Sequence, residues 1–285
     1  MKTIALYNPA SGSVTTEGKD RLRAALEAAD VREADVIEID CSDFHGQLSR
    51  LSAQSPDLFV VWGGDGTLRS ALAVAGQTTP NLLLLPGGTM NLLTRSIHGD
   101  KAWDVVLKDV LAGPRRRTIP AGRVDQEHFY CAMLAGAPAR FAEARESLRR
   151  GELVKAASEA RVALDTLNSL HLDASYRDGY SFGHERLPST SVIGALVGPV
   201  AKGEGMEIAA LSAPSAGAAL NVVWSSFLSD WRNAPGVTVV PARSLTIENP
   251  EGGDIPVIID GEAIEAGSRV KVRFVEEAAQ CLTAA

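Results

Sequence analysis

The chain has 285 residues, a formal net charge of −7, 45% apolar residues and 22% charged residues. This length allows one large domain or two ordinary ones, and the composition is typical of a soluble globular protein. The negative charge argues against a nucleic-acid partner, and no apolar run approaches the roughly 20 residues that span a bilayer.

The amino terminus and the cysteines indicate a compartment. The chain begins with a strand-like run and not with a signal peptide. Cys41, Cys131 and Cys281 lie far apart and match neither a metal-binding spacing nor a disulfide framework. We therefore expect a protein of the reducing cytoplasm. The oligomeric state is left open.

The first part of the chain alternates between strands and helices. Short apolar runs predict strands at residues 2–7, 36–39, 58–62 and 81–85. Helical spacing predicts helices at residues 16–29, 44–53, 68–75, 91–97 and 103–111. This alternation predicts a Rossmann-like α/β domain with a parallel sheet and right-handed crossovers.

Three of these strands run into loops rich in Gly, Ser, Thr and Asn, at residues 8–13, 63–67 and 87–91. Parallel strands bring the three loops to one edge of the sheet, where doubly wound proteins bind ligands. Glycine lets backbone N–H groups approach phosphate oxygens. We expect a polyphosphate site there, and the candidate residues are Asn8, Ser11, Gly12, Gly63, Gly64, Asp65, Gly66, Thr67, Gly88, Thr89 and Asn91.

Asp65 is the carboxylate of the central loop. Beside a phosphate it would be repelled unless a cation lies between them or the carboxylate handles a proton. A simpler alternative is a plain strand-to-helix turn in which Asp65 caps the helix.

The pattern changes near residue 115. Short β segments separated by Gly, Pro, Asn and Asp follow, with one long predicted helix at residues 139–170. We expect a nucleotide-binding domain at 1–116 and a mostly antiparallel β-sandwich or open barrel at 117–285, with the active site in the cleft between them. A return of the last strand to the first domain is left open.

The long helix carries six basic residues among four glutamates. We interpret this alternation of sign as a solvated face, with docking to an anionic membrane as the second interpretation. The apolar residues Trp224, Phe227, Leu228 and Trp231 also have two interpretations. We favour packing in the core of the β domain, and the alternative is contact with a membrane.

Near the carboxyl end, an apolar run precedes Asp260-Gly261-Glu262. By itself this triplet is most simply a tight hairpin turn. As a functional element it would supply a second acidic cluster that folds over the cleft.

Four motifs in this order resemble the diacylglycerol kinase catalytic-domain family, which includes bacterial lipid kinases and sphingosine kinases. They are Asn8-Pro9-Ala10-Ser11-Gly12, Gly63-Gly64-Asp65-Gly66-Thr67, Gly88-Thr89-Met90-Asn91 and Asp260-Gly261-Glu262. The resemblance implies a nucleotide domain followed by a lipid-binding β domain, and transfer of the γ-phosphoryl group of ATP to a lipid hydroxyl with Mg²⁺. It also implies a cytoplasmic enzyme that contacts the membrane transiently to reach its lipid.

Residue roles follow from the same resemblance. Asp65 would act through Mg²⁺ and the phosphates, Glu262 would be the proton acceptor, and Asp260 would support Glu262 or the metal. In a competing assignment Asp65 is the base.

The chain also departs from the family pattern. Arg69 and Ser70 stand where many members have Asn and Glu, and Leu92 stands where many have Asp. The stretch at residues 213–221 lacks the acids of a structural magnesium loop found in bacterial members. Two alternatives therefore stay open, a nucleotide-binding regulator with weak or no catalysis and an NAD kinase-like small-molecule kinase.

Overall fold

The computed structural model describes the chain apart from residues 16, 80, 137–138, 140–157, 159–169, 180–184, 199–200, 202–204 and 213–230. The chain divides into two compact units. Unit 1 comprises Met1–Pro120 and Glu276–Ala285, and unit 2 comprises Ala121–Val275. The chain therefore leaves unit 1 once and returns to it with its carboxyl-terminal residues.

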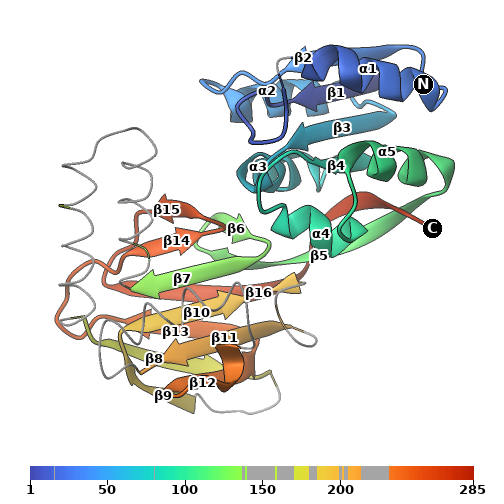
Figure 1. Cartoon of the computed structure of the whole chain (residues 1–285). Coiled ribbons are helices and arrows are strands. Elements are labelled where there is room, and N and C mark those ends of the chain that lie inside the picture. The colour runs from blue at the N-terminus through green and yellow to red at the C-terminus, as the bar shows by residue number, and fades with distance from the viewer. Residues whose placement is uncertain are drawn as a thin grey trace. The chain divides into compact units, whose positions relative to one another are not determined.

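Unit 1 is built on a parallel sheet with the strand order β2-β1-β3-β4 (Figure 1). The strands are β1 (Thr3–Tyr7), β2 (Ala34–Glu38), β3 (Leu58–Gly63) and β4 (Leu82–Pro86). Every residue of β1, β3 and β4 is buried. Burial on both faces is the reason that these strands have continuous apolar sequences. The predicted parallel α/β sheet is confirmed.

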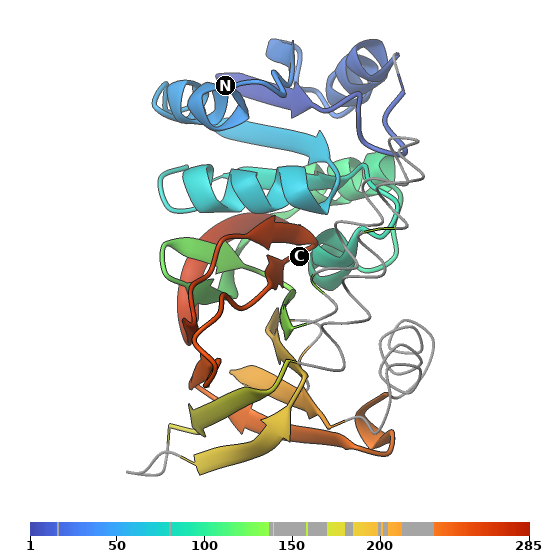
Figure 2. The same cartoon turned by 90° about the vertical axis from the view of Figure 1, so that its left-hand side faces the viewer.

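Helices cover both faces of this sheet (Figure 2). They are α1 (Gly18–Ala28), α2 (Phe44–Ser52), α3 (Asp65–Ala75), α4 (Leu92–His98) and α5 (Trp103–Ala112). Leu22 and Leu26 of α1 share one core cluster with Val106 and Val110 of α5. Helix α3 begins at Asp65, earlier than the predicted start at residue 68, because extended Gly64 already serves as its N-cap.

Unit 2 is formed largely from two six-stranded sheets, with orders β6-β5-β16-β13-β8-β9 and β12-β11-β10-β7-β14-β15. The first sheet contains β5 (Pro114–Val124), β6 (Glu127–Phe129), β8 (Leu172–Arg177), β9 (Glu185–Thr190), β13 (Ser244–Glu248) and β16 (Arg269–Ala284). The second contains β7 (Ala132–Gly136), β10 (Val192–Leu196), β11 (Met206–Leu211), β12 (Val237–Ala242), β14 (Val257–Ile259) and β15 (Glu262–Ile264). A short 3₁₀ helix, η2 (Trp231–Asn233), precedes β12.

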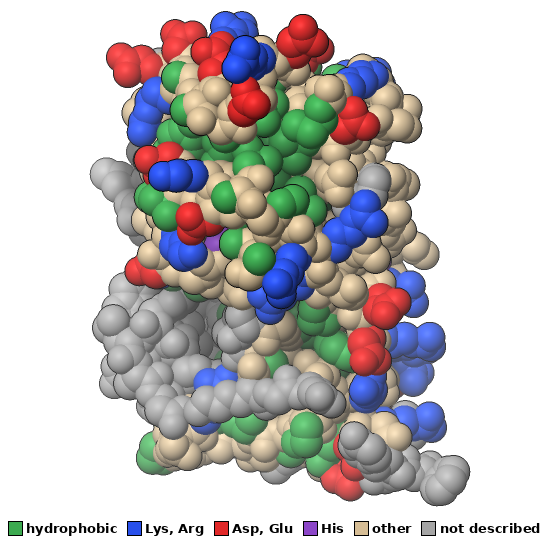
Figure 3. Space-filling view, turned by 90° about the vertical axis from the view of Figure 1, so that its right-hand side faces the viewer, with side chains coloured by type: hydrophobic (Ala, Val, Ile, Leu, Met, Phe, Trp, Pro, Cys, Tyr) green, Lys and Arg blue, Asp and Glu red, His purple; other side chains and the backbone are tan. Residues whose placement is uncertain are grey.

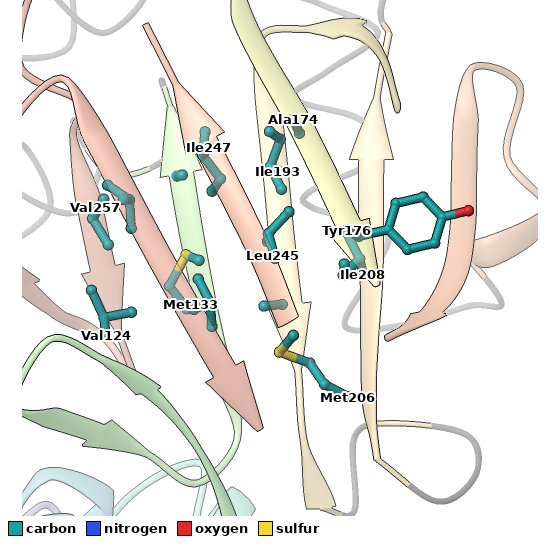
Figure 4. Packing of buried hydrophobic residues seen from close by; sticks show 14 of the residues in the cluster. Val124, Met133, Ala174, Tyr176, Ile193, Met206, Ile208, Leu245, Ile247 and Val257 are labelled. Carbon is teal, nitrogen blue, oxygen red and sulfur yellow. The ribbon is translucent and has the colours of Figure 1, made fainter. Parts of the chain in front are cut away.

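One apolar core joins the two sheets. Leu245 and Ile247 of β13 contribute from the first sheet, and Met133 of β7 and Ile193 of β10 contribute from the second (Figure 4). The inward residues alternate with outward ones along β8, β13 and the first part of β16, which is the pattern of a sandwich. The predicted mostly antiparallel β-sandwich is confirmed.

Several details of unit 2 differ from the sequence-based expectation. β5 is one continuous strand, and β9 and β15 were not predicted. β9 is polar and contains Pro188, which an edge strand tolerates because one side of its backbone lacks a neighbour. The predicted helix at 139–170 lies outside the described residues, apart from a few isolated positions. Within the described part of the chain, no helix has the length and apolar character needed to cross a membrane.

Candidate functional site

The strand order of unit 1 places the three glycine-containing loops together. β1 pairs with β2 on one side and with β3 on the other, and β4 follows β3. The order of the strands along the sheet therefore reverses direction at β1. The loops after β1 and β3 leave the sheet side by side at this switch point. The loop after β4 leaves from the neighbouring strand.

Hydrogen bonds join the first loop to the second. The N–H of Asn8 donates to the carbonyl of Trp62 at 2.9 Å. Asn8 Nδ2 donates to Thr67 Oγ1 at 2.9 Å. The N–H of Gly64 donates to Ser11 Oγ at 3.0 Å. Asn8 and Ser11 thus hold the glycine loop in one position relative to β1.

The third loop is tied to the other two through backbone groups. The N–H of Gly87 donates to the carbonyl of Gly63 at 2.8 Å, and the N–H of Ser13 donates to the carbonyl of Gly87 at 3.0 Å. The Asn91 side chain closes the loop on itself, since Oδ1 accepts from the Gly88 N–H at 2.8 Å and Nδ2 donates to the Gly88 carbonyl at 2.9 Å. Asn91 therefore shapes this loop, with left-handed φ of 50° that Asn tolerates better than most residues.

Two glycines are required by close approach. A Cβ on Gly88 would lie 2.9 Å from the Cα of Gly64, and a Cβ on Gly12 would lie 2.8 Å from Thr89 Oγ1. A Cβ on Gly88 would force apart two backbones that come from different strands, and a Cβ on Gly12 would displace the Thr89 hydroxyl. A plain strand-to-helix turn does not require such close approach between loops from different strands.

The edge offers amide donors at the start of α3. The N–H groups of Asp65, Gly66 and Thr67 precede any helical acceptor, and the first helical bond runs from the Leu68 N–H to the Gly64 carbonyl at 3.0 Å. Such a helix start favours an anion through its free donors and its dipole. The arrangement suits phosphate oxygens.

The Asp65 carboxylate is half-buried and lies between two helix starts. Its Oδ1 accepts from the Leu93 N–H in the first turn of α4 at 3.1 Å. Its Oδ2 accepts no hydrogen bond from the part of the chain that the structure describes. Asp65 thus caps α4 rather than α3 and keeps one oxygen for another partner.

The residues present suit Mg²⁺ bound together with a nucleotide. Among the described residues, no group of three or more His, Cys, Asp or Glu side chains could hold a metal. Mg²⁺ at nucleotide sites commonly takes one or two carboxylates and completes its shell with phosphate oxygens and water. One carboxylate with a free oxygen beside amide donors meets this requirement.

Asp260 and Glu262 lie in unit 2, on the hairpin that joins β14 to β15. Ile259 pairs with Glu262, and Asp260 and Gly261 between them have φ of 46° and 91°. This is the tight turn that the sequence allowed. The exposed Glu262 side chain begins β15.

The Asp260 carboxylate is engaged by main-chain amides. Oδ2 accepts from the Tyr130 N–H at 2.7 Å, and Oδ1 accepts from the N–H groups of Cys131 and Ala132 at 2.9 Å each. The Asp260 N–H returns a bond to the Ala132 carbonyl at 2.8 Å. Asp260 therefore fixes the hairpin against the start of β7.

A hollow of about 600 Å³ lies beside this hairpin. Its lining includes Ile255 and Val257 before the turn, and Ile264 and Ala266 after it. Asp254 and Glu265 add carboxylates to the lining. The hollow is therefore partly apolar and partly acidic.

Sequence reasoning missed three contributors to the site in unit 1. Gly87 has as little room as Gly88, because its Cβ would lie 3.0 Å from Gly63 and 2.7 Å from Val14 Cγ2. Its position in Pro-Gly-Gly after a strand was the available signal. The Leu93 amide and the Trp62 indole, which donates to the Pro86 carbonyl at 3.0 Å, gave no signal in the sequence. The acid-poor stretch at 213–221 lies outside the described residues.

Comparison with known proteins identifies relatives of the segment that carries this site. Residues 2–124 match the family of the diacylglycerol kinase catalytic domain. A diacylglycerol kinase of Mycobacterium tuberculosis (strain CDC 1551 / Oshkosh) is 29% identical over 130 residues, which cover 45% of this chain and 41% of that protein. The chain thus matches less than half the length of this curated relative.

Two further comparisons concern the fold and the alternative activity. The crystal structure of a diacylglycerol kinase from Bacillus anthracis (strain Sterne) matches with a TM-score of 0.68 at 14% identity, covering 99% of this chain and 96% of that one. NAD kinase 1 of Parasynechococcus marenigrum (strain WH8102) is 42% identical over only 72 residues, 24% of this chain and 23% of that protein. The predicted resemblance is confirmed: residues 2–124 match the diacylglycerol kinase catalytic-domain family, and the whole chain shares the fold of a solved diacylglycerol kinase.

Proposed function

We propose that this protein is an ATP-dependent lipid kinase that transfers the γ-phosphoryl group to a lipid hydroxyl. The observation that carries the proposal is the convergence of three glycine loops on the Asp65 carboxylate at one sheet edge, within the segment that matches the kinase family. Phosphoryl transfer requires positioning, neutralised phosphate charge and a polarised acceptor hydroxyl. The loops supply donors for the first two requirements.

Asp65 would hold Mg²⁺ through its free carboxylate oxygen, and the metal would neutralise charge on the phosphates. The amides at the start of α3 would bind phosphate oxygens, and Ser11, Gly12, Thr89 and the Gly88 loop would line the nucleotide. Asn8, Thr67 and Asn91 would keep these loops in register through the hydrogen bonds described above.

We assign the proton acceptor to Glu262, whose exposed carboxylate would take the proton of the lipid hydroxyl. Asp260 would support it by fixing the hairpin, since both of its oxygens are bound by amides. The competing assignment gives the base role to Asp65. The apolar part of the lining beside the hairpin, such as Ile255 and Ile264, is compatible with a lipid tail.

Steady-state kinetics of two isosteric variants test these roles. The variants are Asp65→Asn and Glu262→Gln. The control is Glu251→Gln, which changes an exposed carboxylate of unit 2, the unit that contains Glu262. With γ-labelled ATP, Mg²⁺ and a lipid extract, we expect Glu262→Gln to lower kcat by about 100-fold or more with little change in nucleotide affinity. Asp65→Asn should weaken Mg²⁺-dependent nucleotide binding as well. Near-native turnover of Glu262→Gln would refute the base assignment.

A second candidate is a nucleotide-binding regulator without catalysis. It is favoured by Arg69 and Ser70, which are 9% and 8% exposed and stand where many family members have Asn and Glu. Leu92, where many have Asp, is exposed at the loop. ATP binding in calorimetry without a labelled lipid product would favour the regulator. A labelled product would instead identify the acceptor lipid.

A further inference from the structure

The outer face of the sheet that contains β8, β13 and β16 carries an excess of positive charge. Along β16, exposed Arg269, Lys271 and Arg273 alternate with buried Val270 and Val272. The outward positions of β13 are Ser244, Thr246 and Glu248, and those of β8 are Asp173, Ser175 and Arg177. The inward residues of all three strands pack in the sandwich core.

The strand register arranges these residues in rungs across the sheet. Ser244 lies between Arg273 and Arg177, and Thr246 lies between Lys271 and Ser175. Ser175 in turn lies opposite Arg186 on β9. These two neighbouring rungs contain four cations, several hydroxyl groups and no carboxylate.

The next rung contains two acidic residues. Glu248 lies between Arg269 and Asp173, and its carboxylate pairs with the Arg269 guanidinium at 3.1 Å. Arg177, Arg186, Lys271 and Arg273 form no hydrogen bond or ion pair through their side chains with any residue that the structure describes. We call these four residues the basic sheet face.

The basic sheet face is unusual for this chain, whose net charge is −7. Like charges gathered on one sheet face repel one another when no acid lies between them. The face therefore carries a local positive potential that an external anion would relieve. Figure 3 shows Lys and Arg side chains, with some Asp and Glu among them, along the lower right edge of the view.

The shape of the face indicates an extended partner. A shallow hollow of about 280 Å³ lies over it, lined by Arg177, Ser244, Thr246, Lys271 and Arg273 among others. The cations are exposed and the hydroxyls only half-buried, as on an open surface. Four long cations on the three strands β8, β9 and β16 match an array of phosphate groups better than a single small anion.

We propose that the basic sheet face docks on the surface of an anionic lipid bilayer. The choice of a membrane rests on the proposed function, because the lipid acceptor of such a kinase resides in a bilayer, and on the charge complementarity between this face and anionic lipid. Each Lys or Arg near an anionic surface contributes about fivefold to membrane partitioning at moderate salt.

Vesicle co-sedimentation without nucleotide tests the proposal. The wild-type chain, a Lys271→Glu/Arg273→Glu variant and a control Lys19→Glu/Arg23→Glu variant are mixed with phosphatidylcholine vesicles, with or without about 30% phosphatidylglycerol. Lys19 and Arg23 are exposed on α1, so the control makes the same change of charge on unit 1. We expect binding of the wild type only to anionic vesicles, weakened by salt, and a loss of at least about tenfold in the first variant but not in the control.

Three results would overturn the proposal. They are equal binding to neutral vesicles, equal losses in both charge variants, and no vesicle binding together with calorimetric binding of inorganic phosphate that the first variant abolishes. The last result would assign the face to a soluble anion.

A failure of the membrane-docking proposal can be distinguished from a failure of the proposed kinase function. Asp65→Asn should bind anionic vesicles as the wild type does even if it transfers no phosphate. The Lys271→Glu/Arg273→Glu variant should retain phosphorylation of a short-chain lipid dispersed in detergent.

Discussion

At the scale of residues, the site of unit 1 is defined by what each side chain contacts rather than by its type alone. Asp65 and Asp260 are both carboxylates in glycine-containing turns. Asp260 is engaged by three backbone amides, whereas Asp65 accepts one and keeps a second oxygen available. This difference in hydrogen bonding is the reason for assigning magnesium to Asp65 and support of the hairpin to Asp260.

His98 gives unit 1 a pH-dependent stability. Its imidazole is largely buried at the end of α4, and Nε2 has no hydrogen-bond partner among the described residues. Burial lowers the pKa of His98 from 6.5 to about 4, and the nearby cations Arg117 and Lys101 act in the same direction against a hydrogen bond to Leu84. The folded state therefore holds the neutral ring.

Because the folded pKa is lower than the unfolded one, this contribution is present above pH 6.5 and is lost as the pH falls toward 4. Between about pH 7.5 and pH 5.5, the free energy of unfolding should fall by about 1 kcal/mol through this group. Urea denaturation of the wild type and of His98→Gln at both pH values measures it. An equal pH dependence in the two proteins would contradict the assignment.

At the scale of elements, the β14–β15 hairpin is attached to β7 by the pairing of β14 with β7 and, at its turn, by the Asp260 carboxylate. Removal of the carboxylate would leave the amides of Tyr130, Cys131 and Ala132 without their acceptor. These amides lie in a buried part of unit 2. The hairpin also carries Glu262, so the position of the proposed base depends on how the hairpin is attached.

We expect Asp260→Ala to lower the free energy of unfolding by about 2–4 kcal/mol, because charged hydrogen bonds are lost and buried donors remain. Asp260→Asn should cost less, since Asn keeps one acceptor oxygen and tolerates the positive φ. Chemical denaturation gives both values. If Asp260 were instead a metal ligand, both variants would weaken Mg²⁺ binding and leave the stability of the apoprotein nearly unchanged.

At the scale of the whole molecule, the long strand β16 belongs to both units. Its first part pairs with β13 in unit 2, and Glu276–Ala285 belongs to unit 1. Gln280 donates its N–H to the Gly76 carbonyl at 2.8 Å, and Leu282 joins the cluster that contains Trp62. Unit 1 is therefore completed by the carboxyl-terminal residues.

Leu282→Ala should destabilise unit 1 by about 2–4 kcal/mol, because Leu282 is only 5% exposed in that cluster. Gln280→Ala is the control, since its side chain is exposed on the same strand. Trp62 and Trp103 stack with centroids 4.2 Å apart in the same region, so their fluorescence reports the unfolding of unit 1. Equal stability of the two variants would show that the last residues contribute little to the core.

The fold class and most of the candidate residues were predictable because they depend on local patterns. β1, β3 and β4 were recognisable as buried runs, and the glycine loops follow them directly. β9 and β15 were not recognisable, since a polar edge strand and a three-residue strand have little periodicity. The Leu93 amide that binds Asp65 also lacks a signal, because every residue has a backbone amide.

An α/β part with glycine loops after its strands, and a β-rich part with an acidic turn, follow from the amino-acid sequence alone. The folded structure was needed to show that β1 lies between β2 and β3, which carbonyls and amides join the loops, and that the outward residues of β8, β13 and β16 align as rungs. The physical reason is the distance along the chain over which each kind of interaction acts. Local propensity and burial pattern act over a few neighbouring residues, whereas strand order and register depend on contacts between residues far apart in the chain.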